Sequence, residues 1–173
     1  MKLGFNALAI DQRSGGKRWG RDNATVTARG GSTKYAEALP DLEAAFKWSR
    51  DNGYSGAIVV WGSSYSAALV FLLAAQHPRA ISGVVAMSPG EYLRERKGAV
   101  AAAAKKIAGK LPVLVLTPPK EREVAKAIAA AAGVSLHLPP KSVHGSSMLI
   151  GRKNPAAADV WPLVERFLKR FQN

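Results

Sequence analysis

The chain has 173 residues, of which 47% are hydrophobic and 21% charged, and this length and composition predict one domain over residues 1–173 with a sizeable core. It contains no cysteine, which excludes disulfides, zinc–thiolate sites and a cysteine nucleophile. The net charge is +13, but the basic residues are spread over the polar faces of predicted helices, so we expect a solvated basic surface and no nucleic-acid partner.

The first predicted element is a strand over residues 5–10, followed by a glycine-bearing loop that starts at Asp11. The loop lacks the G-x-G-x-x-G pattern of a dinucleotide site, and we expect Asp11 and Arg13 to brace it by hydrogen bonds. The N-terminus is too short and interrupted for a signal peptide, and no apolar run approaches the ~20 residues of a membrane helix. We therefore expect a cytoplasmic protein with no membrane partner.

Helical and strand patterns alternate along the rest of the chain. The expected strands cover residues 57–61, 81–87, 111–116 and 134–138, and the expected helices cover residues 40–51, the segment from 64 to 76, residues 91–109, the segment from 121 to 133, and a C-terminal stripe from 160 to 171. This alternation predicts an α/β fold with a mainly parallel sheet covered by helices on both faces. Functional side chains gather beyond the carboxyl ends of such strands, where Ser64, Ser88, Glu121 and His144 lie.

The run over residues 57–76 organises the chain. A β-branched apolar run leads at Ser64 into a helix, and such a sharp turn exposes its central side chain toward the N–H groups that open the helix. With Ser64 at the centre, the positions two residues away are Gly62 and Ser66, which are small; with Ser63 there, two bulky aromatic residues would collide. Ser64 is therefore the candidate nucleophile, the alternative being a serine in an ordinary strand-to-helix turn.

The pattern G-x-S-x-S at this turn resembles the G-x-S-x-G elbow of the α/β-hydrolase superfamily, and within it small serine esterases of the dienelactone-hydrolase type. The resemblance covers the chain only from the family's fourth strand onward, so it implies an N-terminally reduced α/β-hydrolase fold. It implies that the backbone N–H of Tyr65 is one oxyanion donor, while the family's loop that supplies the second donor has no counterpart here.

A serine nucleophile needs a histidine base that is oriented by a carboxylate. His77 ends a predicted helix and His137 lies inside a predicted strand, whereas His144 lies in the loop after the last strand. The resemblance places the catalytic histidine in that loop, and a solvent-facing histidine without a role is the alternative. Three scattered histidines and no cysteine predict no metal site, and nothing in the sequence predicts a cofactor.

The carboxylate expected to orient the histidine departs from the family pattern. The resemblance implies an Asp in a pattern like G-x-x-D after the second-to-last strand, but residues 117–121 contain neither that glycine nor an Asp. Counting from the strand end, Glu121 matches the acid position, and Glu123 is the alternative. Both could instead be first-turn carboxylates that the helix dipole favours.

These features predict a serine hydrolase that cleaves small carboxylic esters through an acyl-enzyme. Ser64 attacks the carbonyl, His144 transfers the proton, Glu121 orients the imidazole and the Tyr65 N–H receives the oxyanion. The alternative is a non-catalytic module of this fold whose basic surface binds an acidic partner. Because the family's third strand is missing, the runs at 5–10 and 57–61 are left with unpaired edges, which predicts a homo-oligomer, most simply a two-fold dimer.

Overall fold

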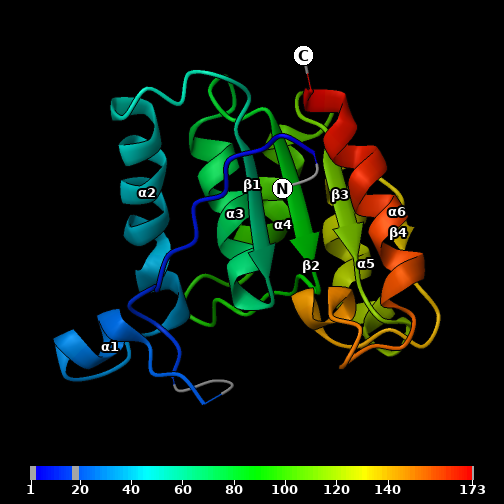
Figure 1. The fold of residues 1–173 in the computed structure, drawn as a ribbon, viewed down its shortest axis with the longest axis horizontal. Helices are drawn as coiled ribbons and strands as arrows, with labels where there is room; N and C mark the ends of the chain where they lie inside the picture. Colours follow the sequence, from blue (N-terminus) through cyan, green and yellow to red (C-terminus); the bar gives the residue numbers. More distant parts are fainter. Residues whose placement is uncertain (1–2, 17–19, 173) are drawn as a thin grey trace.

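The computed structural model describes residues 3–16 and 20–172 (Figure 1). Residues 1–2 and 173 of the predicted domain, and residues 17–19 of the polar stretch after the first loop, lie outside the described residues. The described chain contains one parallel sheet in the order β1-β2-β3-β4, made of β1 (Val59–Ser63), β2 (Gly83–Met87), β3 (Val113–Leu116) and β4 (Leu136–His137). The predicted α/β class is confirmed. β1 is as long as the predicted run at 57–61 but lies two residues later, and the other three strands are shorter than their apolar runs.

Helices connect and flank these strands. They are α1 (Ala24–Arg29), α2 (Leu39–Asp51), α3 (Tyr65–Gln76), α4 (Ala99–Ile107), α5 (Arg122–Ala131) and α6 (Ala157–Leu168), with shorter 3-10 turns η1 (Tyr35–Ala38), η2 (Pro119–Glu121), η3 (Gly145–Leu149) and η4 (Lys169–Phe171). Pro40 lies in the first turn of α2, where its missing N–H costs no helical hydrogen bond. The helix ends before Gly53, whose φ of 84° is unfavourable for other residues.

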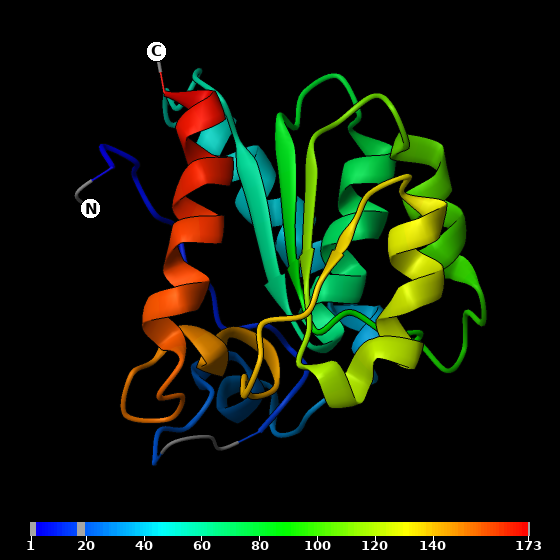
Figure 2. The same cartoon turned by 90° about the vertical axis from the view of Figure 1, so that its right-hand side faces the viewer.

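The core has two layers, one on each face of the sheet. On one face, Val84 and Ala86 of β2 pack with α2 to α5; on the other, Val85 and Met87 pack with α6. Figure 2 shows the strands between α6 on one side and α3, α4 and α5 on the other. Because both faces of β2 are covered, its residues are all buried, as the continuous apolar run predicts. α3 is buried from Ala67 to Ala75, which fixes its N-terminus against the sheet.

The predicted strand over residues 5–10 is wrong. The segment forms no strand, and Leu8 and Ile10 are 52% and 38% exposed. Figure 1 shows it running beside the β1 side of the sheet toward α2. A strand needs a neighbour to accept and donate its ladder hydrogen bonds, and β1 pairs only with β2 among the described residues. The apolar pattern alone could not reveal that no neighbour is in place.

The predicted helix over residues 91–109 begins late, at Ala99. Gly98, with a φ of 75°, precedes it, and the segment from residue 91 onward makes turns instead. The carboxylate of Glu91 accepts hydrogen bonds from the backbone N–H groups of Val100 (3.3 Å) and Ala101 (2.8 Å). Glu91 therefore caps α4 from outside the helix, where a negative charge also favours the helix dipole.

Candidate functional site

The turn between β1 and α3 has the strained geometry of a nucleophile elbow. Ser64 has a φ of 58° and a ψ of −126°, a conformation that residues other than glycine rarely adopt. Its backbone N–H donates to the carbonyl of Met87 at 2.9 Å, which ties the turn to β2. A β-carbon at Gly62 would collide with the carbonyl of Ser66, so the close approach predicted for a turn centred on Ser64 is present.

The structure brings Glu121 and His144 together. The Nδ1 atom of His144 lies 3.0 Å and 2.9 Å from the two carboxylate oxygens of Glu121. With Nδ1–H donating to the carboxylate, Nε2 keeps a lone pair that can accept a proton. Glu123, the alternative acid, has a side chain that is 78% exposed and lies 3.9 Å from Arg122. The geometry therefore favours Glu121 over Glu123 as the partner of His144.

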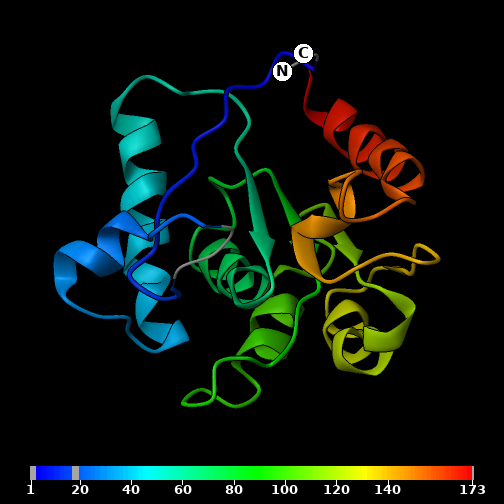
Figure 3. The same ribbon diagram turned by 60° about the horizontal axis from the view of Figure 1, so that its bottom comes forward.

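One backbone hydrogen bond and one close approach hold the His144 loop against β1. The N–H of Ser146 donates to the Ser63 hydroxyl at 2.9 Å, and Gly145 has a φ of 63°. A side chain at Gly145 would collide with Ser63 and lie 3.9 Å from the backbone nitrogen of Ser64. Figure 3 shows η3, which Gly145 begins, beside the end of β1. His144 is thus adjacent to a residue that packs on the elbow.

No hydrogen bond joins the Ser64 hydroxyl to the His144 imidazole, and both residues belong to the described part of the chain. The His144 side chain is 45% exposed, against 21% for Glu121. Such contacts are often long in the absence of substrate and shorten in the reacting complex. The Tyr65 N–H is the first of α3, at the positive end of the helix dipole.

The loop that begins at Asp11 packs on the elbow. The Gln12 side chain donates to the Ser66 hydroxyl at 3.0 Å, and the Tyr65 hydroxyl donates to the carbonyl of Ser14 at 2.8 Å. The Tyr65 ring is stacked on Tyr35, with centroids 4.3 Å apart. The sequence implies a role only for the backbone N–H of Tyr65, and no local pattern shows that its side chain anchors this loop.

Asp11 and Arg13 brace that loop, as expected. Asp11 accepts from the N–H of Ala24 at 3.0 Å, and the guanidinium of Arg13 donates to Asp41 at 2.7 Å and 2.8 Å. The Arg13 backbone N–H also donates to Asp41, at 2.7 Å. Burial alone would raise the pKa of Asp41, but the hydrogen bonds and charge of Arg13 outweigh it, so this pKa lies below its ordinary value of 3.8.

We therefore expect Asp41→Asn to lower the melting temperature at pH 7 by roughly 2–4 °C. A lowered folded-state pKa means that Asp41 stabilises the fold above its unfolded pKa of about 3.8 and loses that effect as pH falls through the folded value. The difference between the two proteins should thus be complete at pH 7 and close below about pH 3.8. Circular dichroism melts across this range measure it. Asp51→Asn, which removes an exposed pair with Lys47, is the control; an equal effect there would contradict the prediction.

Tyr92 lies near Glu121, and no pattern in the sequence points to this neighbour. Its hydroxyl donates to the carbonyl of Ser88 at 3.3 Å. Burial, and secondarily the charge of Glu121, raise the pKa of Tyr92 above its ordinary value of 10.0, so it stays a neutral donor at physiological pH. A β-carbon at Gly90 would collide with its ring, which explains the glycine at that position.

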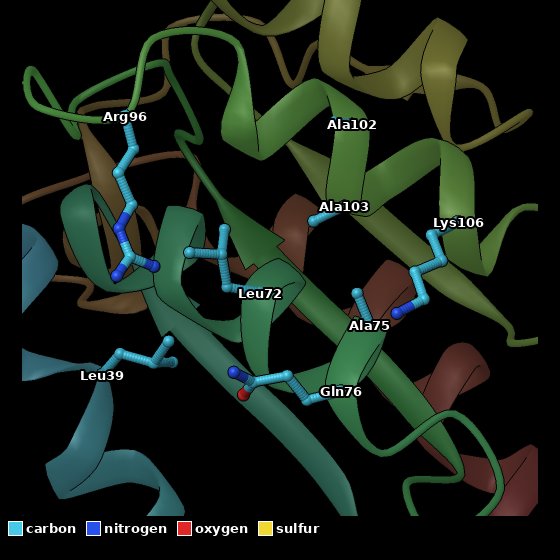
Figure 4. Close-up of a pocket in the computed structure, with 8 residues that line it drawn as sticks. All are labelled: Leu39, Leu72, Ala75, Gln76, Arg96, Ala102, Ala103 and Lys106. Carbon is cyan, nitrogen blue, oxygen red and sulfur yellow. The ribbon is translucent and has the colours of Figure 1, made fainter.

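A hollow of about 250 Å³ lies elsewhere, between the ends of α3 and α4 and the start of α2 (Figure 4). Its floor is apolar, and Arg96, Lys106 and Gln76 extend over it. None of its lining residues belongs to the elbow, the His144 loop or the segment of Glu121, so it is not where the described chemistry is placed.

The other two histidines lie apart from this group. His77 caps the end of α3 and packs on Phe46, with ring centroids 4.9 Å apart, and His137 lies in β4. Within residues 3–16 and 20–172, no cluster of three or more acidic or histidine side chains could hold a metal ion. The helices of the same described residues are all too short or too polar to cross a membrane.

Comparisons with known proteins agree with the observed α/β fold. A family model described as "Serine aminopeptidase, S33" matches residues 1–146. The solved structure of an esterase from Pyrococcus furiosus is similar to this chain, with a TM-score of 0.57 and 20% identity, over 82% of this chain and 65% of the esterase. At that identity the similarity shows the fold, and the chain spans less than two thirds of the esterase's length. No curated protein matched the chain.

Proposed function

Because the chain belongs to the serine aminopeptidase S33 family of α/β-hydrolases, we propose that it is a serine hydrolase that cleaves small carboxylic esters. The observation that carries this proposal is the contact of His144 Nδ1 with Glu121, at 2.9 Å and 3.0 Å, in a loop packed on the elbow of Ser64. The esterase from Pyrococcus furiosus shares the fold, which supports but does not by itself specify an ester substrate.

The reaction proceeds in two halves. The Ser64 hydroxyl oxygen attacks the ester carbonyl while Nε2 of His144 takes its proton, and Glu121 stabilises the imidazolium. The Tyr65 N–H donates to the carbonyl oxygen as it becomes negative. The C–O bond then breaks, the alcohol leaves with the proton from His144, and an acyl-enzyme remains on Ser64. Water repeats the sequence as nucleophile, which releases the carboxylic acid and restores the serine.

A second candidate function is a non-catalytic module that binds an acidic partner. Two observations favour it. The net charge is +13, and no hydrogen bond joins Ser64 to His144, two residues that the structure describes. Turnover of a chromogenic short-chain ester by the purified protein, with Ser64→Ala as the comparison, distinguishes the two. Turnover that depends on Ser64 supports the hydrolase, and equal rates for the two proteins support the module.

We also propose that the protein forms a two-fold dimer through the edge of β1. The ladder with β2 uses the backbone of alternate residues such as Ser64, so the N–H and C=O groups of Val59, Trp61 and Ser63 point away from β2. Val59 and Trp61 are only partly buried. Unpaired apolar edges are templates for association with another strand.

Light scattering after size exclusion, at micromolar protein and moderate salt that screens the positive charges, should give the mass of two chains. Leu8→Lys, which places a charge in the exposed segment beside this edge, should shift the mass toward one chain. Val124→Lys alters an equally exposed apolar residue, on α5, and should leave the mass unchanged. A monomeric wild type with full activity would refute the dimer.

A further inference from the structure

Two buried hydroxyl groups, those of Ser88 and Thr117, contact the segments that carry Glu121 and His144. Ser88 follows β2 and Thr117 follows β3, and both residues are 0% exposed. Ser88 has a φ of 53°, an unfavourable conformation for a serine. A strained, fully buried polar residue persists only where its surroundings hold it, so the contacts of these two hydroxyls bear on the site.

Their contacts connect the loop of His144 to the carboxylate of Glu121. The backbone N–H of Gly145 donates to the Ser88 hydroxyl at 2.9 Å. The hydroxyl oxygens of Ser88 and Thr117 lie 3.5 Å apart, and the Thr117 hydroxyl donates to a Glu121 oxygen at 3.3 Å. That N–H belongs to the peptide group between His144 and Gly145, so its position fixes the backbone that carries the imidazole.

The direction of this chain of hydrogen bonds follows from the number of protons. The ionised carboxylate of Glu121 can only accept, so the single hydroxyl proton of Thr117 points to it. The Thr117 oxygen is then open to the proton of Ser88, and the Ser88 oxygen accepts the N–H of Gly145. Every donor points toward the carboxylate, an arrangement in which each bond polarises the next.

We infer that Ser88 and Thr117 are positioning residues, whose hydroxyls hold the Glu121 carboxylate and the His144 loop in the arrangement that the reaction requires. The inference rests on the proposed hydrolase function. Neither hydroxyl reaches the substrate in this role, because both are buried behind the acid. Thr117 acts on the orientation of the carboxylate, and Ser88 acts on both Thr117 and the loop.

Thr117→Val, which keeps the branched shape and removes the hydroxyl, should lower kcat for a chromogenic short-chain ester about 10-fold. KM should stay within about 2-fold, since no substrate contact is lost. Thr117→Ser should recover most of kcat. Thr27→Val, at an exposed position of α1, is the matched control and should leave both constants unchanged.

The decisive measurement repeats Thr117→Val in a Glu121→Gln background. If the Thr117 hydroxyl acts through the Glu121 carboxylate, Thr117→Val should lower the kcat of the Glu121→Gln protein by less than about 2-fold. An equal fall in both backgrounds would mean a merely structural role and would overturn the inference, as would an unchanged kcat in the single variant. If Thr117→Val does not fold, Ser88→Ala carries the same cycle with the same expectations.

The outcome also separates this inference from the function on which it rests. A wild type no more active than Ser64→Ala overturns the hydrolase and the inference together. A wild type whose turnover depends on Ser64, combined with additive effects of Thr117 and Glu121, overturns the inference alone.

Discussion

Ser64→Ala should reduce turnover of a chromogenic short-chain ester by at least about 10³-fold. In the proposed mechanism the Ser64 hydroxyl oxygen forms the acyl-enzyme, so without it only substrate binding and the oxyanion donor remain to accelerate hydrolysis. The fold should survive, because the Ser64 N–H keeps its hydrogen bond to the Met87 carbonyl and a β-carbon is retained at the elbow. Initial rates and a circular dichroism melt measure the two effects.

Ser55→Ala is the matched control for that loss, since Ser55 lies exposed in the loop before β1. A fluorophosphonate probe provides a second, independent readout, because its covalent adduct can be mapped by mass spectrometry. The adduct should lie on Ser64. An adduct on Ser63 or Ser88 would contradict the assignment, and those two hydroxyls already accept hydrogen bonds from the His144 loop.

Glu121→Gln should lower kcat on the order of 10²–10⁴-fold with little change in folding. Glutamine keeps the shape of the side chain but carries no charge, and it leaves one acceptor oxygen for Nδ1–H of His144 where the carboxylate offers two. The imidazolium then loses its counter-charge, and the tautomer that makes Nε2 a base is held less firmly. Steady-state kinetics with the same ester measure the fall.

Glu123→Gln is the comparison, two residues further along the same segment. Its side chain is 78% exposed and contacts Arg122 rather than His144, so it should change kcat by less than about 2-fold. The reverse ranking would move the acid to Glu123. No effect from either variant would mean that Ser64 and His144 act as a dyad.

Where local pattern and long-range packing agree, the sequence predicted the structure well. The elbow was predictable because Gly62 and Ser66 report a close approach within a few residues of Ser64. The sheet followed from apolar runs that are buried on both faces, such as β2. The partner of His144 followed from counting residues beyond a strand end, where the structure places Glu121 within 3.0 Å of it.

The remaining features depend on contacts between distant segments, which a single sequence does not display. The run at residues 5–10 is apolar like a strand, but whether a strand forms depends on a neighbour at the β1 edge. The hydroxyls of Ser88 and Thr117 follow two different strands and meet only through the register of β2 and β3. Glu91 caps α4, which starts several residues after it. Helical periodicity alone could not distinguish this arrangement from one longer helix that starts at Glu91.

The contacts that complete the site span long stretches of chain. The bond from Gly145 to Ser88 joins residues 57 positions apart, and the bond from Ser146 to Ser63 joins residues 83 positions apart. Closing such loops is entropically costly and comes late in folding, whereas the helix that follows Ser64 forms from local contacts. On the ribosome, α3 can therefore form well before the site around Ser64 is complete. We expect the proposed hydrolytic competence to be acquired only when the segment after β4 has been synthesised and has docked.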